Sequence, residues 1–237
     1  MLRKLFFVFL LGLFLINQNT FGQSVGLNFS LAFPQGDFKD NLKTFGWGGS
    51  AEGLLPLHPV VGVGVNVGFY NYGSETRNEP WSYTIPDVTM EVSRSNNIAN
   101  LHIFMRLSPP MTTFKPYVDL LAGGSYLWTE TSVYSQNNNN NEPIASTNNM
   151  DDFAWSYGVG AGFMFKVLDM PSEQEGMDSE LFIDLKVRHL WGSEAMYLTR
   201  GDIEINNSNP VKPIVIYHAR KSATDLLTAH LGVIVLF

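Results

Sequence analysis

The 237-residue chain contains no cysteine. It therefore has no disulfide framework, no thiol catalyst and no cysteine that could carry a lipid anchor. Basic residues are also few, and the formal net charge is −7 at pH 7. Loss of Arg3 and Lys4 with a cleaved N-terminal segment would bring the charge to −9, because no acidic residue precedes position 23. So acidic a chain offers no broad basic face to a nucleic acid.

Long apolar runs are scarce as well. One run, residues 5–16, follows Arg3 and Lys4 and precedes the small residues Thr20 and Gly22, which is the order of a secretory signal peptide. It is shorter than the about 20 residues that a transmembrane helix needs. We expect a signal peptide over residues 1–23 and one domain over residues 24–237. Since no later stretch is long and apolar enough, any membrane span of the mature chain would be built from strands.

Side chains of alternating character are abundant instead. Residues 224–237 place Leu227, Leu231, Val233 and Phe237 on one face and Thr228, His230 and Gly232 on the other. Successive side chains of a β-strand point to opposite faces, so this pattern predicts a strand with one apolar face. The same period predicts eight strands, over residues 25–33, 47–55, 60–70, 97–107, 116–128, 153–167, 180–190 and 224–237.

The connections between these strands alternate in length. Those over residues 34–45, 71–96, 131–152 and 192–222 are long, whereas 56–59 and 108–114 are short. Transmembrane barrels have short periplasmic turns and longer extracellular loops. We therefore predict an all-β fold, an eight-stranded antiparallel transmembrane β-barrel with long extracellular loops and periplasmic termini. The acidic connection 168–179 departs from the rule, and residues 211–219 predict a hairpin within the last loop.

Charged residues test which face meets lipid, because the strand faces were chosen from apolar residues alone. Seven charged residues within the predicted strands fall opposite the apolar face: Glu52, Arg106, Asp119, Lys166, Asp184, Lys186 and Arg188. A Lys or Arg facing lipid at the midplane costs about 2–4 kcal/mol. A soluble, lipocalin-like barrel would invert the two faces, but glycines such as Gly62, Gly64 and Gly160 suit a narrow lumen. We predict a lumen polar network of ion pairs that fills the bore and disfavours a wide pore.

The chain resembles the small outer-membrane β-barrel family of Bacteroidota, which shares the architecture of the OmpA and OmpX barrels and of PorT-like proteins. The resemblance spans residues 24–237 and is carried by the segments PYVDLLAGG at 116–124, GVGAGF at 158–163 and SATDLL at 222–227. It implies residence in the outer membrane of a Gram-negative bacterium. It also implies that the terminal aromatic, Phe237, is the barrel-assembly signal read by the barrel-insertion machinery.

Catalytic chemistry is conceivable because some outer-membrane barrels are hydrolases. His102 and His230 lie on the inward face and could approach Ser125, Thr228 or Glu52, although no spacing requires it. A hydrogen-bonding role in the lumen is the simpler interpretation. No pair of histidines has the spacing of a zinc site, so we expect no metal, cofactor or catalytic residue.

The sequence therefore favours a non-catalytic barrel with a structural or surface-interaction role. Its loops would present Trp81, Tyr83, Tyr134 and the asparagine run 137–141 to the exterior. Two alternatives stay open: an accessory component of an envelope process such as protein secretion, and a lipid-modifying hydrolase. The expected partners are outer-membrane lipid, the insertion machinery and envelope or secretion proteins, with no nucleic acid.

Overall fold

The computed structural model describes residues 23–82, 85–135, 142–170, 179–199, 201–206 and 214–237. Residues 1–22 of the predicted signal peptide and the asparagine run 137–141 lie outside the described residues, as does Tyr83. Within the described part of the chain, no helix is long and apolar enough to cross a membrane.

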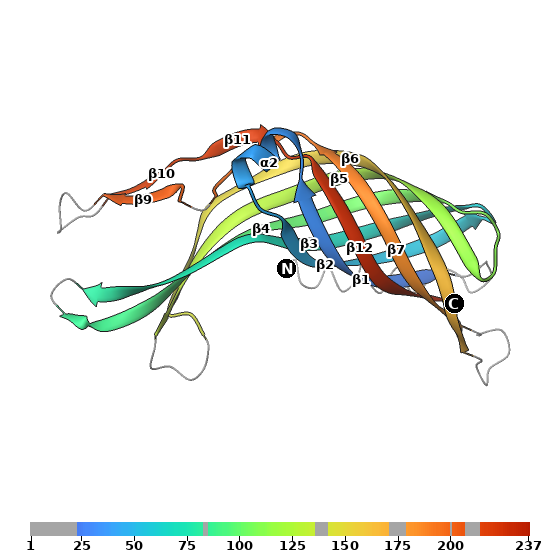
Figure 1. The fold of residues 1–237 in the computed structure, drawn as a ribbon, viewed down its shortest axis with the longest axis horizontal. Helices are drawn as coiled ribbons and strands as arrows, with labels where there is room; N and C mark the ends of the chain where they lie inside the picture. The colour runs from blue at the N-terminus through green and yellow to red at the C-terminus, as the bar shows by residue number, and fades with distance from the viewer. Residues whose placement is uncertain (1–22, 83–84, 136–141, 171–178, 200, 207–213) are drawn as a thin grey trace, which may run out of the picture.

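Eight long strands form one closed barrel in which every neighbouring pair is antiparallel (Figure 1). The ring runs in chain order and is closed by the first and last strands, where Ser24 pairs with Leu236 and Pro34 with Leu226. The predicted eight-stranded antiparallel barrel is confirmed. Its strands are β1 (Ser24–Pro34), β2 (Gly46–His58), β3 (Val61–Ser82), β4 (Ile85–Leu107), β5 (Phe114–Ser135), β6 (Ala145–Met170), β7 (Ser179–Gly192) and β12 (Leu226–Leu236).

Four of these strands are much longer than the sequence pattern predicts. Residues 71–96 and 131–152 were expected to be loops, but β3 pairs with β4 as far as Ser82 and Ile85, and β5 pairs with β6 as far as Val133 and Ala145. Above the barrel, both faces of a hairpin can meet water, so polar residues occupy both faces and the alternation disappears. The backbone hydrogen bonds between the paired strands continue although the side-chain alternation has ended. At the opposite end, β6 also extends to Met170, into the connection predicted over residues 168–179.

Short elements gather around the end of the barrel from which these hairpins rise, here called the mouth. Helix α2 (Gly36–Leu42) follows β1, and the segment between β7 and β12 contains β8 (Glu194–Tyr197), β9 (Ile203–Asn206), β10 (Ile214–Tyr217) and β11 (Arg220–Ala223). Strands β9 and β10 form a separate hairpin, as β8 and β11 form a separate pair. The hairpin predicted within the last long connection is confirmed: the alternating run at 214–217 forms β10, which pairs with β9.

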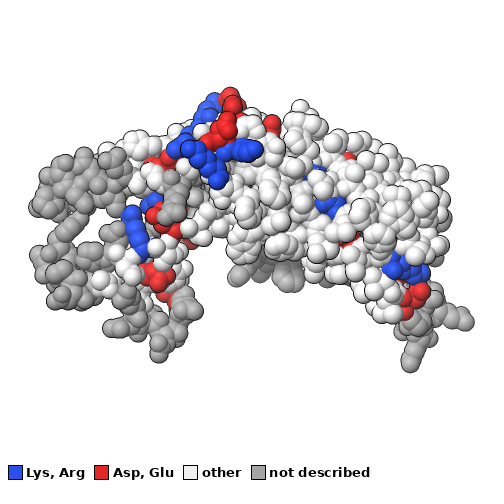
Figure 2. All heavy atoms as spheres, in the orientation of Figure 1, with Lys and Arg blue, Asp and Glu red and all other residues white. Residues whose placement is uncertain are grey.

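The barrel wall separates two opposite environments. Inward side chains are buried whether polar or not, while the outward face carries large exposed apolar residues such as Leu27, Leu101 and Ile103, with exposed fractions of 63%, 59% and 61%. In Figure 2 the visible wall is mostly uncharged, and Lys, Arg, Asp and Glu gather mainly around α2 and β11, on the outer hairpins and at the opposite end of the barrel. The barrel therefore has its charges inside and its apolar residues outside.

Candidate functional site

Six charged side chains meet inside the barrel and form the lumen cluster: Glu52, Arg106, Asp119, Asp184, Lys186 and Arg188. They come from β2, β4, β5 and β7, and each is at most 5% exposed. The alternation of inward and outward residues places all of them on the lumen face. With three cations and three anions, the cluster carries no net formal charge.

Arg106 and Asp119 form the bidentate pair of the lumen cluster. They face each other across β4 and β5, and Arg106 donates from Nε to Oδ1 at 2.8 Å and from Nη2 to Oδ2 at 3.0 Å. Arg188, from β7, donates to the same Oδ2 at 2.7 Å. Fork-to-carboxylate geometry is the strongest ordinary form of charge-assisted hydrogen bond. The pair links the neighbouring strands β4 and β5, and Arg188 adds β7.

Glu52 links all three cations of the lumen cluster. Its Oε1 accepts from Arg106 at 3.0 Å, while its Oε2 accepts from Lys186 at 2.7 Å and from Arg188 at 3.0 Å. Glu52 is therefore the residue through which β2 is connected to β4 and β7. A buried charge is tolerable only when such partners replace its hydration.

Aromatic and apolar side chains close the space around the lumen cluster. The Tyr117 hydroxyl donates to Asp184 at 2.5 Å, and the Arg106 guanidinium lies 3.8 Å from the centre of the Tyr117 ring. Both Arg106 and Arg188 also approach the ring of Phe104. Four apolar residues are also buried inside the barrel: Phe104, Leu121, Met164 and Phe182.

Lys166, the seventh residue of the predicted network, lies elsewhere. It is on the inward face of β6, but it pairs with Glu180 at 2.6 Å and with Asp169, near the end of the barrel opposite the mouth. Its cross-strand partner is Phe182, whereas Gly162 is the residue of β6 that faces Lys186. The depth of a residue along the barrel axis depends on the register between neighbouring strands. The alternation of apolar and polar residues within one strand does not reveal this register.

The two inward histidines make hydrogen bonds to hydroxyl groups rather than to carboxylates. His102 Nε2 lies 2.7 Å from Ser156 Oγ. His230 Nδ1 lies 2.7 Å from Ser30 Oγ, and its Nε2 lies 2.8 Å from Thr228 Oγ1. A catalytic triad places an acidic residue on the second nitrogen. Ser30 is 0% exposed, so a substrate has no access to this pair.

Within the described ranges, no three His, Cys, Asp or Glu residues gather to hold a metal ion.

Helix α2 caps part of the mouth. Phe38 is 0% exposed, and its ring packs edge-on against Tyr197 at 4.9 Å and more loosely against Tyr72. Leu42, one helical turn later, is also buried. The predicted loop 34–45 therefore contains a short helix with an inward apolar side. The spacing of Phe38 and Leu42 was the sequence signal, but seven residues are too few for a convincing helical period.

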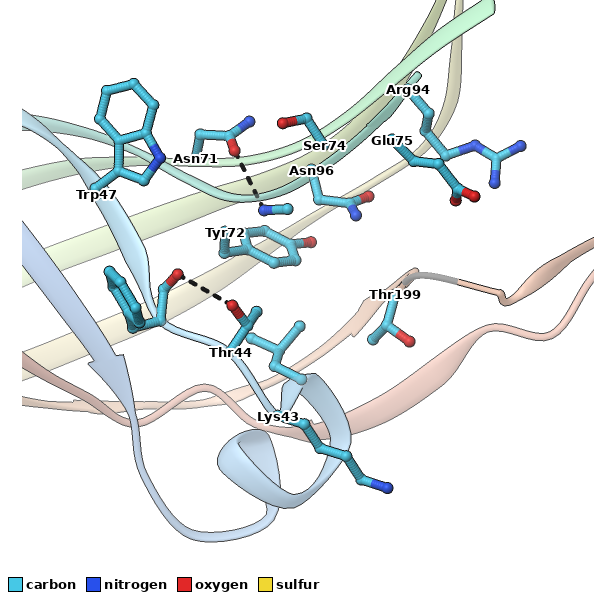
Figure 3. A pocket seen from close by; sticks show the side chains of 13 residues that line it. Lys43, Thr44, Trp47, Asn71, Tyr72, Ser74, Glu75, Arg94, Asn96 and Thr199 are labelled. Carbon is cyan, nitrogen blue, oxygen red and sulfur yellow. Dashed lines mark hydrogen bonds between the residues drawn. The ribbon is translucent and has the colours of Figure 1, made fainter. Parts of the chain in front are cut away.

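A cavity of about 490 Å³ opens beside this helix, at the mouth (Figure 3). Its wall combines the link from α2 to β2, the first part of the β3–β4 hairpin beyond the barrel, and Thr199 from the last connection. Polar side chains from β3 and β4 face aromatic ones from β2 and its preceding link. Sequence reasoning did not identify this cavity, because its three parts meet only after the barrel closes.

Asp202 ties the last connection to β11. Arg220 donates to both oxygens of Asp202 at 2.9 Å, and Thr199 donates to Oδ2 from its backbone and its hydroxyl, each at 2.8 Å. Burial alone would raise the pKa of Asp202, but the hydrogen bonds from Arg220 and Thr199 outweigh it and hold that pKa below its usual value. This arrangement fixes the segment that carries Thr199 into the cavity wall.

We expect acid to release this segment. A carboxylate with a lowered pKa in the folded state stabilises that state above its ordinary pKa, about 3.9. The stabilisation is lost as the pH falls through the lower, folded value. In Asp202→Asn, hydrogen exchange measured by mass spectrometry should be faster over residues 194–206 at neutral pH than in the wild type. Glu194→Gln, which removes the exposed pair with Lys221, is the control and should leave exchange near Thr199 unchanged.

No protein-family model matches the chain, and no curated protein matches it significantly. Several solved structures are similar to the chain. Ail, the attachment invasion locus protein of Yersinia pestis, in complex with the heparin analogue sucrose octasulfate, is 12% identical with a TM-score of 0.43, over 92% of this chain and 100% of that one. The N-terminal β-barrel domain of Pseudomonas aeruginosa OprF is 13% identical with a TM-score of 0.38, over 91% and 99%. A major outer membrane protein of Thermus thermophilus is 14% identical with a TM-score of 0.33, over 92% and 100%.

Proposed function

We propose that this chain is a non-catalytic outer-membrane β-barrel whose outer hairpins and mouth serve surface interactions. The observation that carries the proposal is the inverted barrel: charges are buried in the lumen and large apolar side chains are exposed on the wall. In water, such an exterior would be a very large exposed apolar surface, which soluble monomers avoid. In a bilayer, the same surface meets hydrocarbon, and the closed ring satisfies the backbone groups of the barrel wall.

Aromatic side chains support the membrane assignment by forming two belts. Towards the mouth, outward rings contact one another in the pairs Phe69–Trp128, Tyr126–Trp128 and Phe153–Trp155. Towards the opposite end, Phe114 contacts Phe163 and Phe165. Aromatic girdles mark the two interfaces of outer-membrane barrels. The apolar band between them has the place expected for the hydrocarbon core.

The outer hairpins give the interaction role its surface. The β3–β4 and β5–β6 hairpins rise beyond the mouth belt and carry polar side chains, including exposed Ser74, Thr76 and Asn78. Strand β3 loses its β2 neighbour after Asn71, so one edge of the raised sheet lies beyond the barrel wall. We propose that this end faces the cell exterior and that both termini are periplasmic.

Cysteine labelling can test this orientation, because the native chain has no cysteine to interfere. A membrane-impermeant maleimide should label Asn78→Cys on intact cells, since this residue is exposed on the β3–β4 hairpin. Met111→Cys, in the turn between β4 and β5, should be labelled only after the outer membrane is permeabilised. The reverse labelling pattern would overturn the orientation, and equal labelling of both would contradict a membrane barrier between them.

A lipid-modifying hydrolase is less well supported. The nearest approach to a catalytic arrangement is Ser30 with His230, but it is enclosed in the lumen and ends on the Thr228 hydroxyl. The affiliation with PorT-like proteins of Bacteroidota and a role in secretion are finer proposals, which co-purification with envelope proteins would test. Recognition of Phe237 by the insertion machinery also stays a prediction. The Phe237 ring is 59% exposed, and its backbone donates to Gln23 at 2.8 Å.

A further inference from the structure

The mouth cavity contains an unusual donor. Arg94, from β4, is only 8% exposed, yet its buried Nε has no hydrogen-bond partner. A buried donor left without an acceptor is costly, and the large majority of such groups in folded proteins are paired. Arg94 also lines the cavity, so its guanidinium group is within reach of an acceptor on a bound molecule. In Figure 3, Arg94 and Glu75 lie together at one side of the cavity and Trp47 lies at the other.

The charge around Arg94 favours an acidic acceptor. Lys43 lines the same cavity, and Arg77 lies on the same hairpin, close enough to influence Arg94. Burial and then Arg77 lower the pKa of Arg94, while Glu75 opposes them. Two cations, Arg94 and Lys43, and one carboxylate, Glu75, therefore line the cavity, within a chain whose formal net charge is −7. A small positive excess suits a ligand with one negative charge better than a neutral or a highly charged one.

The opposite wall favours a ring with apolar faces. Phe45 and Trp47, which are 52% and 58% exposed, both line the cavity, and Tyr72 lies between Trp47 and Arg94. Aromatic walls with a few fixed polar groups are the usual composition of a small-molecule site, and this cavity has the usual volume for one. An apolar ligand would leave Arg94 unpaired, and a simple anion would leave the rings exposed.

Amide and hydroxyl groups between these two walls complete the pattern. Asn96 is buried, and Thr129 fixes its orientation by donating to Oδ1 at 2.7 Å. Asn71 is held in the same way by contacts with Asn97 and with the backbone of Gly73. The hydroxyls of Thr44 and Ser74 add groups that both donate and accept. A molecule with several hydroxyls around a ring can satisfy such a mixture.

We propose that the mouth cavity binds a sugar ring that carries a single acidic group, with the acid at Arg94 and an apolar face of the ring against Trp47 and Phe45. The inference rests on the proposed function in one respect only: if the mouth faces the cell exterior, the ligand reaches the cavity from outside the cell. Its test uses purified protein in micelles, so failure here is separate from failure of the labelling experiment on cells. The detergent must be an amine oxide, because alkyl maltosides and glucosides present sugar rings themselves.

Saturation-transfer NMR titrations of the full chain with four probes test the ligand class. Glucuronate combines ring and acid, glucose is the ring alone, acetate is the acid alone, and glucose 6-phosphate replaces the carboxylate by a phosphate. We expect glucuronate or glucose 6-phosphate to bind at least tenfold more tightly than glucose and acetate, and the better of the two identifies the acid. Equal binding of acetate would reduce the cavity to an anion site, equal binding of glucose would remove the role of Arg94, and no binding would overturn the proposal.

Matched variants test the residues. Arg94→Gln should weaken binding of the acidic sugar roughly tenfold, as expected for loss of a charge-assisted hydrogen bond, and should abolish its preference over glucose. Arg77→Gln removes a cation from the same hairpin outside the cavity wall and should keep that preference. Trp47→Ala should weaken both sugars, whereas Trp155→Ala, an outward tryptophan away from the cavity, should not. Unchanged binding in both Arg94→Gln and Trp47→Ala, with the barrel intact by its heat-dependent gel mobility, would contradict the proposed site.

Discussion

Glu52→Gln should lower the free energy of unfolding of the barrel by about 3–5 kcal/mol, the usual cost of removing one partner from a buried ionic pair. Glu52 contacts Arg106, Lys186 and Arg188, and its loss leaves three buried cations with two anions. Gln retains the shape but accepts through one neutral oxygen. Urea titration of the protein folded into lipid vesicles, followed by heat-dependent gel mobility, measures the change.

Two further variants separate charge from shape in this experiment. Glu194→Gln breaks a pair in which both side chains are more than 60% exposed, so it should leave the unfolding midpoint nearly unchanged. The double variant Glu52→Gln with Lys186→Met restores equal numbers of cations and anions and should recover part of the loss. If Glu52→Gln unfolds at the wild-type urea concentration, the lumen cluster does not stabilise the barrel.

Ile103→Arg should destabilise the folded protein by about 2–4 kcal/mol in a bilayer, because it places a charge on the lipid face near the middle of the apolar band. Ile103 is 61% exposed and lies between the inward residues His102 and Phe104. On a barrel dissolved in water, the same substitution at an exposed position would change stability by no more than about 0.5 kcal/mol. Reversible folding into lipid vesicles along a urea gradient measures the difference.

Thr76→Arg is the matched control for this second experiment. It adds the same side chain at an exposed position of β3, beyond the barrel wall, where water surrounds it. Its unfolding free energy should stay close to that of the wild type. Equal effects of Ile103→Arg and Thr76→Arg would show that the outward apolar face does not contact lipid, and the membrane assignment would fail.

Local patterns predicted the barrel strands well because burial on one face leaves a trace at every second residue. All eight predicted strands lie in barrel strands, give or take a few terminal residues, and six of the seven charged residues assigned to the lumen are buried there. The pattern ends where that asymmetry ends. Beyond the mouth, β3 to β6 continue as paired strands with polar residues on both faces, and period-2 reasoning took these segments for loops.

Contacts across the barrel have no such local trace. Glu52 and Lys186 are 134 positions apart, and they meet because β2 and β7 end up on facing parts of one closed ring. Lys166 and Lys186 share a face and a charge in the sequence, but the register of β6 against β7 places them at different depths. The sequence therefore shows whether a strand residue points inward or outward, but it does not show how deep in the barrel the residue lies.

The sequence by itself determined the strand number, the facing of each charged residue and the apolar exterior, because each follows from a repeat of two residues. Only the tertiary structure decided which charges pair, how Phe38 packs at the mouth and that Arg94 meets Trp47 and Phe45 around one cavity. Those relations depend on ring closure, strand register and the approach of distant connections. No short window of the chain contains them.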